Sequence, residues 1–336
     1  MKKRRRPVHR KLTKLHKNVA DSILVEAPIV PVSAPRYSFS GHQTFPFRYA
    51  WLPKGIRGLE HDPKLFSKPD AMVTLGVGKN MVDSIRFWCS ALKLAVIDGR
   101  GGTGRPTELG SQLLGKRGWD PYLEDPATLW LLHWQLVESP NIASTWFLAF
   151  TKWNRDVCTR DELINWIQAV ARDSGKKKVT PESIRRDIDV FLRTYVPSRP
   201  DARRPVEDSF DCPLVELGLV RELDDGVYQF NRGPKPTLPV EVFGYALKRY
   251  WDGYASEQGT LGFETVLYGP GSPGAAFKLT ESSLALLLDS LPAWMGFRYD
   301  ETAGLRVLLR SRTVRSIKSI TYLERYYGKR KREEAA

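Results

Sequence analysis

The sequence predicts a mainly α fold of the α+β class, in which helix-rich, tandem winged-helix-like modules carry short β-hairpins. One pattern supports this directly: a polar loop, an amphipathic helix, and then two short strands or a Gly-rich turn recur three times along the chain. The composition, with 42% hydrophobic and 27% charged residues, is that of a globular protein. A length of 336 residues is too great for one typical core, so we expect several domains.

The positions of these patterns divide the chain into four segments. They are a basic, disordered tail and linker (1–36), an N-terminal helical, winged-helix-like domain with an aromatic core (37–155), a second winged-helix-like domain (156–255) and a small C-terminal α+β module with a basic tail (256–336). Residues 1–17 hold nine Lys or Arg and no acid, so they contribute +9 to the net charge of +14. The remaining residues contribute +5. Such a tail either contacts phosphates by counterion release or is a dispensable extension.

The first instance of the pattern has the spacing of a helix-turn-helix. A short helix over 71–75 meets the turn at 76–78, and a longer helix starts near Lys79 with Met81, Ile85 and Trp88 on one face. A strand at 96–97, a loop rich in Gly and Arg that serves as the wing, and a helix capped by Thr107 follow.

The second and third instances follow the same order. Thr180 and Pro181 cap a helix whose apolar face includes Ile184 and Ile188, and strands at 219–223 and 227–230 form a hairpin around Asp224-Asp225-Gly226. Thr280 caps the third helix, before strands near 297–299 and 305–309.

Between the first two instances, the aromatic run 128–134 predicts a buried helix, and Trp146 and Phe150 extend the main core. We interpret residues 269–274 as a linker or lid between the second and third modules.

Two stretches are candidates for phosphate contact. In residues 41–55, His42, Arg48 and Lys54 alternate with aromatic residues, which suits either a surface that holds phosphates and bases or a segment docked on the core by its rings. In Gly76-Val77-Gly78-Lys79-Asn80, two glycines precede a helix N-terminus, which suits an oxyanion site or a structural tight turn. The residues that we predict to bind DNA are Arg48, Lys54, Lys79, Asn80, Arg86, Lys93, Arg100, Arg105, Arg185 and Arg186.

An acidic cluster is the best candidate for phosphodiester hydrolysis, because carboxylates can hold a divalent ion such as Mg²⁺ or Mn²⁺ that activates water. The predicted catalytic residues are His42, Asp120, Glu124 and Asp125, and the sequence does not identify the metal ligands. In the alternative, Asp120 and Asp125 are caps and turn starters before prolines, and His133 near them is a hydrogen-bonded core histidine.

Several function classes lack support. No G-x-S-x-G, H-E-x-x-H, C-x-x-C, P-loop or Rossmann pattern is present, so no nucleotide or organic cofactor is expected. Cys89, Cys158 and Cys212 lie far apart and are expected to be reduced core thiols, which fits the cytoplasm. No apolar run approaches the roughly 18 residues that span a bilayer, so we expect no membrane segment.

Four motifs in the same order resemble a bacterial family. They are Gly41-His-Gln-Thr-Phe45 with Trp51-Leu-Pro-Lys54, Leu75-Gly-Val-Gly-Lys-Asn-Met-Val82, Asp120-Pro-Tyr-Leu-Glu-Asp125 with Thr128-Leu-Trp-Leu-Leu-His-Trp134, and Cys212-Pro-Leu-Val-Glu-Leu-Gly-Leu219. The chain is similar over about residues 38–330 to the SspB-type component of DNA phosphorothioation defence systems. The resemblance implies a DNA-nicking subunit beside a cysteine desulfurase, an ATPase and a sulfurtransferase, and a possible homodimer. It supplies no catalytic residues.

Three functions therefore stay open. The first is a cytoplasmic DNA nickase, a metal-dependent endonuclease that acts in phosphorothioate modification and anti-phage defence. The second is a non-enzymatic winged-helix adaptor or regulator that presents DNA to partner sulfur-transfer enzymes. An assembly scaffold that barely touches DNA is a third possibility, which predicts weak binding once the tail is removed.

Overall fold

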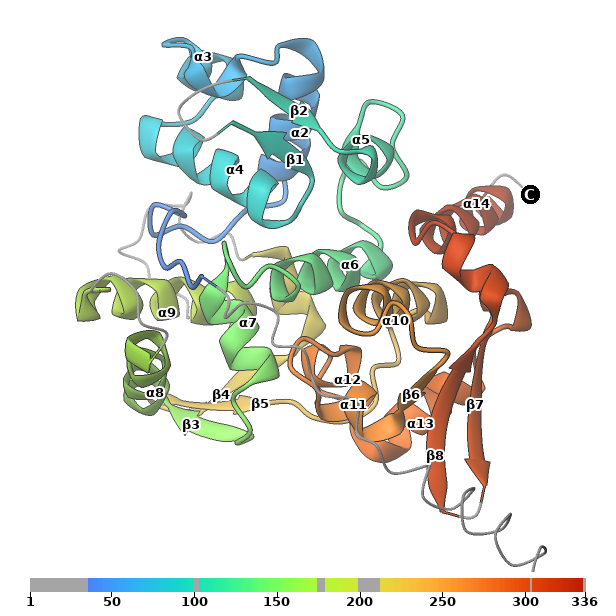
Figure 1. Ribbon diagram of the computed structural model, residues 1–336. Helices are drawn as coiled ribbons and strands as arrows, with labels where there is room; N and C mark the ends of the chain where they lie inside the picture. The colour runs from blue at the N-terminus through green and yellow to red at the C-terminus, as the bar shows by residue number, and fades with distance from the viewer. Residues whose placement is uncertain (1–35, 99–102, 174–178, 199–211, 303, 335–336) are drawn as a thin grey trace, which may run out of the picture. The chain divides into compact units, whose positions relative to one another are not determined.

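Three helical units follow one another along the chain, and each contains a short antiparallel hairpin (Figure 1). The computed structural model describes residues 36–98, 103–173, 179–198, 212–302 and 304–334. The predicted basic tail lies outside the described residues up to position 35, as does Arg100 in the predicted wing. The expectation of a helix-rich α+β fold is confirmed.

The first unit has the predicted helix-turn-helix order. Its elements are α2 (Trp51–His61), η1 (Leu65–Ser67), α3 (Ala71–Leu75), α4 (Lys79–Ala91), β1 (Ala95–Ile97), β2 (Gly104–Pro106) and α5 (Glu108–Leu114). Thr107 caps α5 as predicted, since its hydroxyl accepts the N–H of Gly110 at 3.0 Å. Helix α2 was not predicted, and β2 occupies the end of the predicted loop.

Two buried helices follow, α6 (Pro126–Val137) and α7 (Ser144–Thr151). Every residue of α6 after Pro126 is buried, and so is all of α7. Trp130, Trp134, Trp146 and Phe150 are each at most 1% exposed, so the predicted aromatic core is confirmed.

The second unit surrounds a three-stranded antiparallel sheet. Its elements are β3 (Val157–Thr159), α8 (Arg160–Asp173), α9 (Pro181–Tyr195), η3 (Pro213–Leu217), β4 (Val220–Asp224) and β5 (Val227–Phe230). The sheet order is β3-β5-β4. Thr180 caps α9 and the predicted hairpin is present, with Gly226 at φ 72° in its turn. Strand β3, which pairs with β5, was not predicted.

The third unit repeats that strand order. Its elements are α10 (Val240–Tyr254), β6 (Thr260–Gly262), α11 (Phe263–Tyr268), α12 (Pro273–Ala276), α13 (Glu281–Asp289), η4 (Ala293–Met295), β7 (Phe297–Thr302), β8 (Leu305–Arg310), η5 (Arg312–Ser316) and α14 (Ile320–Glu334). The sheet order is β6-β8-β7, so an early short strand again pairs with the second hairpin strand. Thr280 caps α13 as predicted.

The interpretation of residues 269–274 as a linker or lid is wrong. Ser272 is fully buried and its hydroxyl caps α12 by accepting the N–H of Ala275 at 3.2 Å. Helix α12 packs on α6, α7 and α10. The segment is therefore a short turn, partly exposed at Pro270, that leads into the buried start of α12.

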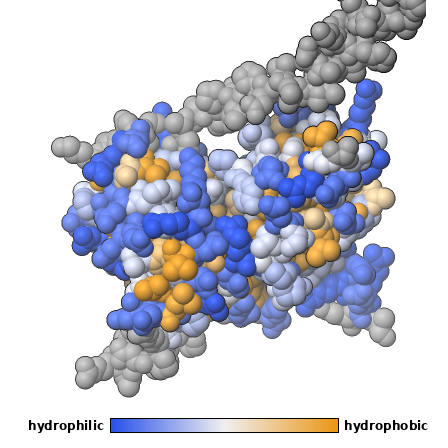
Figure 2. All heavy atoms as spheres, turned by 90° about the horizontal axis from the view of Figure 1, so that it is seen from below, coloured by the Kyte–Doolittle hydropathy of each residue, from blue (hydrophilic) through white to orange (hydrophobic). Residues whose placement is uncertain are grey.

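Residues 36–336, which include all three helical units, form one compact body. Their buried apolar side chains make one continuous cluster. The domain boundaries at 155 and 255 stay predictions. The three cysteines are buried thiols. On the face shown in Figure 2, apolar side chains form small patches among hydrophilic ones. In the described part of the chain, no helix is long and apolar enough to cross a membrane.

Candidate nucleic-acid interface

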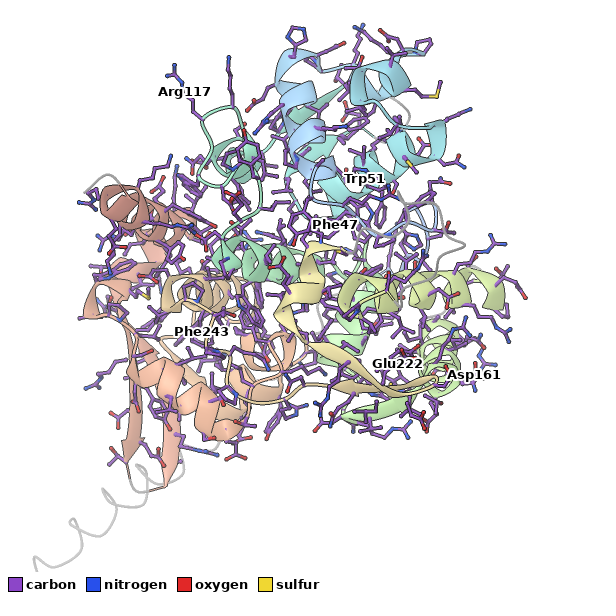
Figure 3. All side chains as sticks on the ribbon, turned by 180° about the vertical axis from the view of Figure 1, so that it is seen from behind. Phe47, Trp51, Arg117, Asp161, Glu222 and Phe243 are labelled. Atoms are coloured by element: carbon purple, nitrogen blue, oxygen red, sulfur yellow. The ribbon has the colours of Figure 1, made fainter. Side chains whose placement is uncertain are left out.

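A cavity of about 760 Å³ lies where the segment before α2 meets the turn between α3 and α4. Its lining residues are Arg48, Tyr49, Ala50, Trp51, Lys54, Gly76, Val77, Gly78 and Met81. Trp51 starts α2 and, like the neighbouring Phe47, is almost completely buried (Figure 3). The two stretches that the sequence marks for phosphate contact therefore line a single cavity.

Two glycines shape the turn at this cavity. Gly76, at φ 64°, is in the left-handed region and ends α3, a conformation that a side chain would strain. Gly78 precedes α4, and no side chain caps that helix. The first N–H groups of α4 therefore lie beside the cavity without a side-chain acceptor, which is the arrangement that suits an oxyanion.

The two cations from the first stretch are held in place by the protein. The guanidinium carbon of Arg48 lies 5.3 Å from the ring centroid of Trp51. The ammonium of Lys54 donates to the carbonyl of Leu75 at 2.9 Å, at the C-terminus of α3. Each cation is thus positioned at the cavity wall.

The outer face of α4 continues the same surface. Lys79 and Asn80 are exposed and Arg86 is half-buried, and none of them takes part in a hydrogen bond or ion pair with the described residues. Asp83 lies between them on the same face and offsets one positive charge. The face therefore presents a modest positive charge along one side of the helix.

The hairpin that follows α4 carries Arg105, exposed on β2 opposite Val96 of β1. This hairpin includes the end of the loop predicted to be the wing, while Arg100 of the same predicted set lies outside the described residues.

Lys93 does not have the open position that a phosphate contact needs. Its ammonium forms an ion pair of 2.9 Å with Glu138, which also pairs with Arg249 at 2.8 Å. Burial lowers the pKa of Lys93 despite the neighbouring carboxylate. The sequence prediction failed here because Lys93 lies just beyond the end of α4, at φ 55°, and turns toward the end of α6.

His42 is buried, not presented to solvent. Its exposed fraction is 1%, and Nδ1 accepts the N–H of Thr44 at 3.1 Å, so Nε2 carries the hydrogen that it donates to Asp187 at 2.7 Å. The carboxylate of Asp187 also accepts the N–H of Ser40 at 2.7 Å and the hydroxyl of Thr145. These contacts tie the segment before α2 to α9 and leave His42 no atom that reaches a substrate.

Two of the three predicted catalytic carboxylates are occupied by the backbone. The two oxygens of Asp120 accept the N–H groups of Glu124 and Asp125, at 2.9 and 3.0 Å. Asp125 caps α6 through the N–H of Ala127 at 2.9 Å. These contacts are those of the alternative interpretation, in which both residues are caps and turn starters.

Helix α14 covers Asp125 as well. Its Tyr326 donates to the Asp125 carboxylate at 3.1 Å, and its Arg330 forms an ion pair with the same group. Glu124 is exposed by contrast. Among the residues that the structure describes, no group of three His, Cys, Asp or Glu side chains is placed to hold a metal ion.

His133 is the core histidine of the alternative interpretation. Its ring lies between the hydroxyl of Tyr195, at 2.8 Å, and the carbonyl of Ala276, at 2.9 Å. Burial lowers its pKa to about 3, so the imidazole is neutral at physiological pH.

Arg185 and Arg186 are exposed on α9, opposite the apolar face formed by Ile184 and Ile188. They belong to the second unit, and Asp187 beside them is the partner of His42. The structure does not bring them to the cavity at α4, whose lining comes entirely from the first unit.

Two residues that line this cavity, Tyr49 and Met81, were not predicted to contribute to the surface. Tyr49 lines the cavity and its hydroxyl donates to the carboxylate of Glu216 on η3. Met81 packs against the core as predicted and, half-buried, also lines the cavity with Val77. The alternation of aromatic and basic residues in 41–55 was the signal that could have included Tyr49.

Comparisons with known proteins cover most of the chain. A family described as a protein of unknown function (DUF4007) matches residues 39–327. A magnesium ion-bound SspB crystal structure is 30% identical with a TM-score of 0.78, and an SspB crystal structure is 31% identical with the same TM-score. Each comparison covers 88% of this chain and 89% of the other. None of the curated proteins compared matches the chain.

Proposed function

Since this chain belongs to the DUF4007 family and is an SspB-type protein, we propose that it is the DNA-binding component of a phosphorothioation system and that it nicks DNA there. The nicking activity is the one that the resemblance of the four sequence motifs to the SspB-type family implies. A nick would open the backbone so that partner enzymes can replace a non-bridging oxygen by sulfur.

One observation carries the DNA-binding part of this proposal. Arg48 and Lys54 line the same cavity as the glycine turn that opens α4, and Lys79 and Arg86 continue the positive surface along that helix. Phosphate contacts from cations and helix N-termini supply most of the sequence-independent affinity for DNA.

The order of elements supports a winged-helix interpretation of this surface. In the first unit α2, α3 and α4 precede the β1–β2 hairpin, and in the other two units a short early strand completes a three-stranded sheet with the hairpin. We therefore assign α4 as the recognition helix, with Arg105 in the wing, because the second helix of a helix-turn-helix enters the major groove by its N-terminal residues.

The cofactor that we propose for nicking is Mg²⁺ or Mn²⁺, as one of the similar SspB structures is described as magnesium ion-bound. The predicted carboxylates do not fit a ready protein cage for such an ion, because Asp120 and Asp125 are engaged as caps. Glu124 is the candidate that stays exposed, so it is the predicted catalytic residue that we retain.

Nicking is tested with supercoiled plasmid incubated with the full chain and Mg²⁺ or Mn²⁺, and again with EDTA. The expected result is conversion to open circles with metal, and its loss in Glu124→Gln. The matched control is Glu60→Gln, an exposed glutamate on α2 outside the cavity. Supercoils that persist with the native protein and either metal, alone and together with its partner enzymes, contradict the enzymatic part of the proposal.

A non-enzymatic adaptor is the second candidate. It is favoured by the capping roles of Asp120 and Asp125, which leave fewer groups for metal-assisted hydrolysis. Salt-dependent DNA binding without strand scission, under conditions in which the partner enzymes are active, would select it.

Partners and assembly are also part of this proposal. We expect a cysteine desulfurase, an ATPase and a sulfurtransferase of the same system, and a homodimer in solution. Light scattering of the purified protein tests the dimer by mass, and co-purification with each enzyme tests the partners.

A further inference from the structure

A second cavity, of about 500 Å³, is lined by residues from the end of α7, from α8 and from the segment that joins α11 to α12. Three of its lining residues are cations, Lys152, Arg232 and Lys278, and no lining residue is acidic. Its volume is in the range of pockets that hold small molecules. No step of the proposed DNA interface uses these residues.

Lys278 is the least ordinary of the three cations, because it is only 1% exposed. Its ammonium nitrogen makes two long contacts, at 3.3 Å to the carbonyl of Ala149 and 3.4 Å to that of Trp153. It also lies 4.7 Å from the ring centroid of Phe230. None of the carboxylates described in the structure forms an ion pair with it, so a buried amine faces the cavity walls without a counterion.

The pKa of this amine agrees with that placement. Burial, with a smaller contribution from the charge of Arg232, lowers the pKa of Lys278 to about 7. An anion beside this amine would stabilise its charged form. The anion would therefore bind here more tightly than at a buried site without a cation. Arg232 is available from the same wall, although its Nε also pairs with Asp156 at 3.1 Å.

A buried donor without an acceptor lies in the same wall. Trp153 is 4% exposed and its indole N–H has no acceptor among the described residues. A buried N–H without a partner is costly, and the indole N–H groups of Trp134 and Trp146 also lack an acceptor among the described residues. A ligand oxygen in the cavity would satisfy the indole N–H of Trp153.

Aromatic rings supply the remaining wall. Trp166 is half-buried, with its ring centroid 5.3 Å from that of Trp153, and Tyr268 is 54% exposed. Phe150 closes the inner end near Lys278, whose nitrogen lies 5.8 Å from its ring centroid. Rings at the mouth of a cavity with cations on its inner wall suit a planar ligand that carries an anionic group.

We propose that this cavity binds a nucleotide that carries a terminal phosphate, with the phosphate toward Lys278 and Arg232 and the base against Trp166 and Tyr268. Two sources share this chemistry, a free mononucleotide and the 5′-phosphorylated end of a DNA strand. The second source would be the product of a nick and so rests on the proposed function, whereas the first does not.

The test uses the full chain and isothermal titration with four probes: dAMP, inorganic phosphate, a 5′-phosphorylated dT tetramer and the same tetramer without its phosphate. We expect a phosphorylated probe to bind and the unphosphorylated tetramer to bind at least about tenfold more weakly, the effect of losing charge-assisted hydrogen bonds. Similar affinity for dAMP and the phosphorylated tetramer identifies a mononucleotide site, and clear preference for the tetramer identifies a strand end.

The variants are Lys278→Met and Arg232→Gln, each expected to weaken binding at least about tenfold. The matched control is Lys235→Met, since Lys235 is also a buried lysine, 8% exposed, but does not line the cavity. Duplex binding by the α4 surface should be unchanged in all three, which separates this proposal from the proposed function. Phosphorylated probes that do not bind the native chain, or that bind both cavity variants as tightly as the native chain, overturn it.

Discussion

Nε2 of His42 donates a 2.7 Å hydrogen bond to the carboxylate of Asp187, 145 positions later in the chain. Both side chains are almost completely buried, with exposed fractions of 1% and 2%. The bond connects the segment that enters the first unit with α9 of the second unit. The most unusual histidine of the sequence therefore holds two parts of the fold together.

We predict that His42→Ala lowers the free energy of unfolding by about 2–4 kcal/mol, because it leaves the buried Asp187 carboxylate short of one donor. Urea denaturation measures this, and Gln43→Ala, at an exposed neighbouring position, should change stability by at most about 0.5 kcal/mol. A folded His42→Ala protein of native stability that has lost only its DNA nicking would instead make His42 catalytic.

Substitutions of Asp125 and Glu124 should distinguish a carboxylate that stabilises the fold from one that does not. Asp125→Ala removes a helix cap and the contacts with Tyr326 and Arg330, so we expect a loss of about 2–3 kcal/mol in unfolding free energy. Glu124→Ala should leave stability within about 0.5 kcal/mol of the native value, since its side chain is exposed. Denaturant titration of both variants decides the matter, and equal losses would refute the assigned roles.

Lys278 should make stability depend on pH. Its pKa is about 7 in the folded chain against an ordinary value of 10.5, so the unfolded chain binds the extra proton between those pH values. Stability is therefore gained as pH rises through this window, by at most about 1.4 kcal/mol per pH unit, and is level below it. The charged and titratable groups that act on the amine are Arg232, Asp156 and Cys158.

The comparison that isolates this effect is between the native chain and Lys278→Met. From pH 7 to pH 9, the native free energy of unfolding should rise by about 2–3 kcal/mol relative to the variant. Parallel pH profiles for the two proteins would show that the amine titrates at its ordinary pKa in the folded state.

Local signals made much of the fold predictable. Thr107, Thr180 and Thr280 each cap the helix that the sequence assigns to them, because a cap depends only on residues two or three positions away. Helix α2 was not predicted because it contains two glycines and a proline, which have low helix propensity. The burial of Trp51 and Ile56 stabilises it. Strands β3 and β6 are three residues long and exist through their pairing with later strands.

The candidate site was predictable in part for the same reason. The Gly76–Gly78 turn and the basic, aromatic segment before α2 were visible as local patterns, and the fold brings Lys54 to the carbonyl of Leu75. What the sequence could not show was long-range pairing. His42 pairs with Asp187 and Lys93 pairs with Glu138, so a partner distant in the chain engages each of these predicted functional residues.

In the proposed function, cations of the folded body bind DNA, and not only those of the basic tail. The direct measurement is the salt dependence of duplex affinity for residues 36–336, the compact unit. We predict binding at low ionic strength, and a slope of log K against log salt that is shallower by about 2 in Lys79→Gln/Arg86→Gln. Arg298→Gln, on β7 of the third unit, should leave the slope unchanged. Failure of residues 36–336 to bind DNA at low salt, or an unchanged slope in the double variant, would show that the α4 surface does not bind DNA.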